Sequence, residues 1–138
     1  PKELTFQAPK SWTRQPKGPL LTAAFEAGEG EQRGKISVMP LPQRADNFAP
    51  NVNRWRFQIG LDEQTPEQIQ KATQALRVDG QPGKLVDLDN PETKTRILGV
   101  IVPKGDQDWF FKMMGPAELV EKESKVFREF VQSGKFAP

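Results

Sequence analysis

The side chains that could do chemistry in this chain are carboxylates and lysines, because its 138 residues include no histidine, cysteine or tyrosine. Their absence excludes Ser-His and Cys-His nucleophiles, zinc bound by imidazole or thiolate, and disulfides. Carboxylates and lysines can still transfer protons on their own. Composition therefore leaves open binding, or acid–base chemistry performed by carboxylates.

One group of carboxylates resembles the start of a calcium-binding loop. The segment 87–94 (DLDNPETK) contains Asp87, Asp89 and Glu92. A loop of the EF-hand type needs a ligand at its fifth position and a glycine at its sixth. These positions hold Pro91 and Glu92, so we expect a solvated turn here and no metal site in the chain.

Two further pairs could imitate catalytic groups. Asp106 and Asp108 resemble the paired acids of a glycosidase, but they flank a predicted tight turn, whereas such acids normally lie in a cleft. Ser124 and Lys125 are neighbours in a helical segment, and neighbouring helical side chains do not face each other. The sequence therefore predicts no catalytic residue and no cofactor.

The helical segment 50–59 offers the best candidate binding surface. Val52, Trp55 and Ile59 recur at helical spacing and form an apolar stripe. At about 100° per residue, four residues fall away from this stripe: Asn51, Arg54, Phe57 and Gln58. Because an aromatic ring and an arginine are both enriched at interfaces, these four are the predicted binding residues. The alternative is an ordinary solvated helix face.

A lysine, Lys112, lies inside the most apolar run of the chain, residues 108–116 (DWFFKMMGP). Alternation along a strand places Trp109 with Phe111 and Met113 on one face, and we expect Trp109 in the core. Lys112 belongs to the opposite face of that strand. A cation in such surroundings needs a polar partner.

The expected partner of Lys112 is Glu123, which lies near the centre of the apolar stripe of a long helix over residues 116–132. This helix must fold straight back over the sheet, since the strand ends just before it. Counted from Gly115, Lys112 lies about 10 Å along the strand and Glu123 about 12 Å along the helix. The sequence thus predicts a structural ion pair between Lys112 and Glu123 beneath this helix, with Arg56 as the rival partner.

Short polar turns separate the elements that must position these residues. Apolar or alternating segments predict strands over 4–7, 20–27, 35–41, 75–80, 83–89, 96–102 and 109–114, and helices over 50–59, 65–75 and 116–132. Residues 96–102 (RILGVIV) are apolar on both faces, as in a strand covered on both sides. The expected fold is a single α+β domain over residues 1–138. Its mostly antiparallel sheet of six to seven strands is flanked by helices on both faces.

Charge and hydropathy limit the partners. The formal net charge is +2 and no run of five or more lysines and arginines occurs, so no nucleic-acid partner is expected. The sequence contains no stretch of 18 apolar residues that could span a bilayer. The chain begins at Pro1 rather than at methionine, which suggests a mature form whose signal or lipid anchor lies upstream.

Three segments carry a resemblance to known proteins: FQAPKSW at 6–12, NVNRWRFQIG at 51–60 and the run from RILGVIV to FVQS at 96–133. They resemble a family of small uncharacterised bacterial proteins of planctomycetes and related phyla, which usually carry a secretion or lipoprotein signal. The element order and the opening F-x-x-P-x-x-W are similar to the PsbP-like α/β/α sandwich. The resemblance implies a location in the periplasm or at the cell surface, and it supplies no catalytic residue.

The expected function is a non-catalytic, exported interaction or ligand-binding domain with a protein or small ligand as its partner. Proteins with the PsbP-like fold mostly bind partners, so the resemblance implies the same here. The alternative is a small carboxylate-dependent hydrolase acting on an envelope polymer. A concave site that holds two or more carboxylates with perturbed pKa values would favour the hydrolase, and a flat patch around Arg54 and Phe57 would favour the binding domain.

Overall fold

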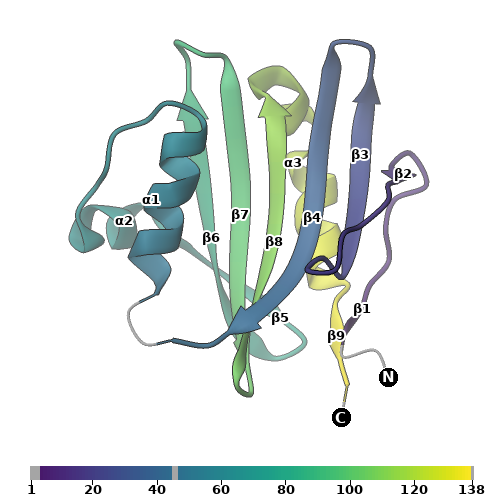
Figure 1. The fold of residues 1–138 in the computed structure, drawn as a ribbon, viewed down its shortest axis with the longest axis vertical. Coiled ribbons are helices and arrows are strands. Elements are labelled where there is room, and N and C mark those ends of the chain that lie inside the picture. Colours follow the sequence, from purple (N-terminus) through teal and green to yellow (C-terminus); the bar gives the residue numbers. More distant parts are fainter. Residues whose placement is uncertain (1–3, 45–46, 138) are drawn as a thin grey trace.

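A computed structural model describes residues 4–44 and 47–137, and a seven-stranded sheet lies at its centre (Figure 1). The elements in chain order are β1 (Leu4–Thr5), β2 (Thr13–Arg14), β3 (Ala23–Glu29), β4 (Gln32–Pro42), α1 (Phe48–Gln58), α2 (Pro66–Ala72), β5 (Gln74–Val78), β6 (Gln81–Asn90), β7 (Thr95–Lys104), β8 (Gln107–Pro116), α3 (Ala117–Gln132) and β9 (Lys135–Phe136). Pro1, on which the expectation of a trimmed start rests, lies outside the described residues.

The sheet has the strand order β2-β3-β4-β8-β7-β6-β5, and every neighbouring pair is antiparallel. Hairpins connect β3 to β4 and run in series from β5 to β8, so most strands pair with a neighbour in sequence. Strands β1 and β9 form a separate two-stranded ribbon that joins the two ends of the described chain. The predicted antiparallel α+β fold is confirmed.

Helices cover the two faces of the sheet differently (Figure 1). α3 packs against one face, and α1 and α2 pack against the other over β6, β7 and β8. Figure 1 shows no described helix in front of β3 and β4 on the face that carries α1. The predicted covering of both faces is therefore confirmed, and part of one face is left open.

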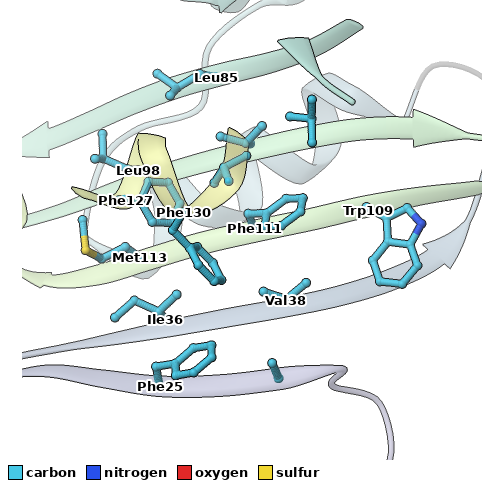
Figure 2. Packing of buried hydrophobic residues seen from close by; sticks show 14 of the residues in the cluster. Phe25, Ile36, Val38, Leu85, Leu98, Trp109, Phe111, Met113, Phe127 and Phe130 are labelled. Atoms are coloured by element: carbon cyan, nitrogen blue, oxygen red, sulfur yellow. The ribbon is translucent and has the colours of Figure 1, made fainter. Parts of the chain in front are cut away.

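The larger core lies between the sheet and α3 (Figure 2). Phe130 of α3 is at its centre, with its ring centroid 5.1 Å from that of Phe6, 5.0 Å from Trp12 and 5.6 Å from Phe25. Trp109 is 3% exposed and belongs to the same core, as the sequence predicts. The smaller core lies on the opposite face, beneath α1 and α2.

α3 covers the face of β8 opposite to the one predicted. It packs on the face of Trp109, Phe111 and Met113, whereas Lys112 lies on the other face with α1. The prediction rested on distance along the strand, which measures depth but does not distinguish faces, because successive strand residues point to opposite sides. The Trp109 face carries no charged side chain on this part of β8, so it accepts the apolar stripe of α3 at no electrostatic cost.

α1, which carries the predicted binding residues, is positioned on the sheet by a close contact with β7. The indole ring of Trp55 lies directly against Gly99, where an added Cβ would come within 2.2 Å of the ring atom Cζ3. Trp55 also contacts the ring of Phe110 edge-on, with centroids 6.2 Å apart. Only glycine at position 99 leaves room for this ring.

The start of α2 follows directly from its sequence. The side chain of Thr65 accepts a hydrogen bond from the Gln68 N–H at 3.2 Å, and the side chain of Gln68 accepts one from the Thr65 N–H at 2.9 Å. This reciprocal arrangement is a capping box, with Pro66 at the first helical position. The predicted beginning of this helix at Thr65 is confirmed.

Candidate functional site

An open groove of about 1690 Å³ lies between α1, α2 and the neighbouring ends of several sheet strands. Its aromatic lining comes from Phe48 and Phe57 of α1 and from Phe110 of β8. Lys84 of β6 also lines it and places its ammonium group 4.7 Å from the centroid of the Phe48 ring. The groove therefore combines apolar rings with a few cationic and amide groups, as small-ligand and peptide sites do.

The structure brings three of the four predicted binding residues to this groove. Arg54 and Phe57 are exposed on it, and Phe57 is 61% exposed. Asn51 also lines it but is only 4% exposed, so its predicted place on an open surface is corrected. Gln58 is absent from the described lining of the groove and instead contacts β8.

Asn51 orients Arg54 rather than presenting its own amide to solvent. The Asn51 Nδ2 atom donates to the backbone carbonyl of Asn47 at 2.7 Å, and its Oδ1 atom accepts from the Arg54 guanidinium at 2.7 Å. A charge-assisted bond to a buried amide fixes a side chain better than water does. Arg54 is thus held toward one side of α1.

Lys112 lies on the same side of α1 as Gln58 and Arg54. Its Nζ atom donates to the Oε1 atom of Gln58. Burial, together with the nearby positive charge of Arg54, lowers the pKa of Lys112 from 10.5 to about 8. Because Arg54 precedes Gln58 by one helical turn, the two cations belong to the same side of α1.

Lys112 and Glu123 do not meet, because they lie on opposite faces of the sheet, and the predicted ion pair between them is wrong. Glu123 has a different partner, because its Oε1 atom accepts a hydrogen bond from the indole Nε1 of Trp12 at 2.8 Å. The rival partner, Arg56, donates to the backbone carbonyl of Asp62 at 2.6 Å. Glu123 and Arg56 therefore each have a hydrogen-bond partner, but it is a distant tryptophan for Glu123 and a backbone carbonyl for Arg56.

Two of the carboxylates weighed as calcium or catalytic groups, Asp87 and Asp108, have protein partners. Asp87 accepts two hydrogen bonds from Arg96, at 2.8 and 2.6 Å, and this bond raises the pKa of Arg96 above its usual value. Asp108 lies in β8 and lines the groove, where its Oδ1 atom accepts from the Gln43 amide at 3.3 Å. Within residues 4–44 and 47–137, no cluster of three or more acidic side chains is placed to hold a metal ion.

Replacing Lys112 by methionine should stabilise the protein near neutral pH, opposite in sign to the effect that a Glu123 pair would give. The folded pKa of about 8 is below the unfolded value, so the charged lysine opposes folding below pH 8 and ceases to do so above about 10.5. Because Lys112 is partly exposed, we expect Lys112→Met to raise the free energy of unfolding at pH 7 by only about 1 kcal/mol. Urea denaturation at pH 7 and pH 10.5 would measure this gain and its disappearance.

The matched control for that substitution is Lys125→Met, at an exposed lysine of α3. A surface change of this kind should alter stability by less than about 0.5 kcal/mol at either pH. A loss of stability in Lys112→Met at pH 7 would contradict the unfavourable burial of its charge.

None of the helices in the part of the chain that the structure describes is long and apolar enough to cross a membrane. No protein-family model matches the chain, and no curated protein sequence matches it.

Solved structures with a similar fold share little sequence with this chain. CyanoP, the cyanobacterial PsbP of Synechocystis sp. PCC 6803, is 14% identical, with a TM-score of 0.56 over 98% of this chain and 93% of that one. LpqN, involved in cell envelope biogenesis in Mycobacterium tuberculosis, is 10% identical, with a TM-score of 0.55 over 98% and 83% of the two chains. A protein of Bacteroides thetaiotaomicron VPI-5482 is 10% identical, with a TM-score of 0.56 over 98% of this chain but 45% of that one, so this chain spans less than half its length. The fold is PsbP-like, as the sequence predicts, and at these identities the likeness concerns the fold alone.

Proposed function

We propose that the chain is a non-catalytic binding domain that engages a protein or small ligand through the surface of α1 around Arg54 and Phe57. The observation that carries this proposal is the exposed ring of Phe57 on the groove. Among the described residues, the one other large apolar side chain exposed to a similar degree is Leu20, at 71%. An aromatic ring in water near an arginine matches the composition of binding hot spots.

The chemistry of the groove favours binding over hydrolysis. Its described lining includes two carboxylates, Glu63 and Asp108, and Asp108 is engaged by Gln43. A hydrolase of envelope polymers needs two acids that face one substrate bond from opposite sides. Rings and cationic or amide groups are the usual means of recognition, and these supply most of what the groove offers.

The proposal includes export to the periplasm or cell surface. Its supports are the resemblance of three sequence segments to a secreted, planctomycete-like family and the envelope role of the structurally similar LpqN. A lipid anchor upstream of the chain fits the same proposal.

Capture from a native envelope extract tests the proposed surface. With the domain immobilised, we expect Phe57→Ala to reduce retention of the specific partner by about tenfold or more, as loss of an aromatic hot spot does. Leu20→Ala is the matched control, because it removes an equally exposed apolar side chain elsewhere, and its retention should equal that of the wild type.

Equal retention by all three proteins would overturn the assignment of the surface to α1. Release of soluble fragments from purified envelope polymer, if abolished by Asp108→Asn, would instead establish the hydrolase.

A further inference from the structure

Lys112 occupies the middle of the sheet, on the face that carries α1. In the strand register it lies between Ser37 of β4 and Gly99 of β7. The Trp55 ring covers Gly99, so one side of the lysine is walled by an indole. On the other side stand Ser37 and, on the next strand, Ala24, both small residues. The ammonium group is therefore desolvated on one side and approachable from the other, where no described helix covers β3 and β4 (Figure 1).

Lys112 is hydrogen-bonded to Gln58, and Arg54 lies one helical turn before Gln58 on the same side of α1, so the fold brings the two cations to neighbouring positions. Among residues 4–44 and 47–137, neither side chain forms a salt bridge with a carboxylate. Like charges held close together in a partly desolvated site repel each other, and an anion removes that repulsion.

Other charged side chains on this face do not neutralise the pair. On the sheet they are Arg33 and Lys35 of β4, Glu26 of β3, Arg77 of β5, Lys84 of β6 and Asp108 of β8. Glu26 pairs with Arg33 at 3.4 Å, and it lies two strands across and two residues along from Lys112, about 12 Å away. Asp108 is four residues along β8, about 13 Å away.

Both cations keep hydrogen-bond donors for a ligand. A lysine ammonium has three N–H donors and an arginine guanidinium has five. In the described structure Lys112 gives one of its donors to Gln58, and Arg54 gives one to Asn51. These two bonds hold the cationic groups in place while leaving most of their donors available. The hydroxyl of Ser37, opposite Lys112 on β4, adds another possible donor.

We propose that Lys112 and Arg54 form a binding site for an oxyanion, the phosphate or carboxylate group of a ligand, on the open sheet face beside α1. The proposal names the ligand class for the surface of α1 proposed above and rests on that function in part. Arg54 is the residue shared by the groove and the oxyanion site. Asn51 and Gln58 act as positioning residues, each through the cation that it contacts.

Proton uptake should accompany binding at this site. An anion beside Lys112 favours its charged form and raises its pKa above about 8. The free protein at pH 8 is therefore partly deprotonated at Lys112, and binding must protonate it. Affinity should be highest below pH 8 and fall as the pH rises above it.

Inorganic sulfate is a suitable probe, because its charge stays constant over this pH range, and acetate is its carboxylate counterpart. We expect saturable sulfate binding by calorimetry at pH 7. Lys112→Met and Arg54→Gln should each weaken it by about tenfold or more, since each removes charge-assisted hydrogen bonds. Lys125→Met should bind as the wild type does. Tighter binding of sulfate than of acetate would assign the site to phosphate groups, and the reverse to carboxylates.

A chemical measurement on the same protein makes the test independent of calorimetry. Acetic anhydride at pH 8 should acetylate Lys112, and sulfate should protect Lys112 but not Lys125, as read by mass spectrometry of the peptides. Absence of saturable binding below about 10 mM, or equal weakening by Lys125→Met, would overturn the proposal. Unchanged affinity between pH 7 and pH 9.5 would do the same.

The two proposals can be overturned independently of each other. The sulfate titration uses the isolated domain, so a missing anion site leaves the capture experiment unaffected. A failed capture with intact sulfate binding would remove the partner surface at Phe57 and keep the oxyanion site.

Discussion

Phe130→Ala should lower the free energy of unfolding by about 4–5 kcal/mol, near the top of the range for a buried aromatic residue. Phe130 is 1% exposed, and its ring contacts those of Phe6, Trp12, Phe25 and Phe111 at centroid distances of 5.0 to 6.2 Å. Its removal leaves a cavity at the junction of α3, the sheet and the N-terminal segment. Urea denaturation followed by tryptophan fluorescence would measure the loss.

A gentler substitution separates the ring contacts from simple burial. Phe127 on the same helix is 0% exposed and forms no ring pair among the described residues. Phe127→Leu should cost about 1.5 kcal/mol, because it removes three carbon atoms from the core but keeps a large apolar side chain. Phe130→Leu also loses four aromatic pairs and should cost about 2–3 kcal/mol. Equal losses for the two leucine variants would show that the ring cluster adds nothing beyond burial.

Gly99→Ala should destabilise the protein by about 3 kcal/mol, although alanine normally suits a strand better than glycine does. The added Cβ would lie 2.2 Å from Cζ3 of Trp55, so the whole of α1 must move away from the sheet. The same measurement on Gly18→Ala is the control, because nothing lies within 4 Å of a Cβ there. That variant should change stability by less than about 0.5 kcal/mol.

The effect of Gly99→Ala should reverse sign once the ring is absent. In a Trp55→Leu background the new methyl group has room, and it should stabilise the strand by about 0.5–1 kcal/mol. The two substitutions should therefore be strongly coupled in a double-mutant cycle. Additive effects would mean that α1 is not seated through contact between Trp55 and Gly99.

Much of the fold could be predicted from local patterns. The alternation around Trp109, the two-sided apolar run 96–102 and the cap at Thr65 each identified an element correctly. Strands β2 and β9 were missed because each has two residues, too few to show a period. The distances along β8 and α3 also could not show which face of the sheet α3 covers. Residues on the two faces of a strand lie at similar distances from its end.

The candidate site could be predicted only in part, for a similar reason. Helical periodicity alone predicted that Arg54 and Phe57 lie away from the apolar stripe of α1, and the structure shows that both line the groove. Asn51 lies only about 40° from Trp55 around the helix, so its burial next to the core could have been expected from the same wheel. The contact of Gln58 with Lys112 joins residues 54 positions apart, and no spacing rule within one element reveals such a contact.

The ribbon of β1 and β9 determines how the domain responds to a mechanical load. Leu4 pairs with Phe136 and Thr5 with Lys135, so the first residue of β1 and the last residue of β9 lie at the same end of the ribbon (Figure 1). Hydrogen bonds between antiparallel strands run perpendicular to the strands. A force that separates the two ends therefore acts along these bonds and opens them one at a time, as in unzipping. It does not shear them together.

Tension next reaches the bond between the Gln7 N–H and Ser133 Oγ, 2.8 Å long, and then the Phe6 ring packed against Phe130. The ribbon is thus a soft link that yields before the seven-stranded sheet bears any load. The α1 surface, carried by the opposite face of that sheet, keeps its geometry while the ends are pulled apart.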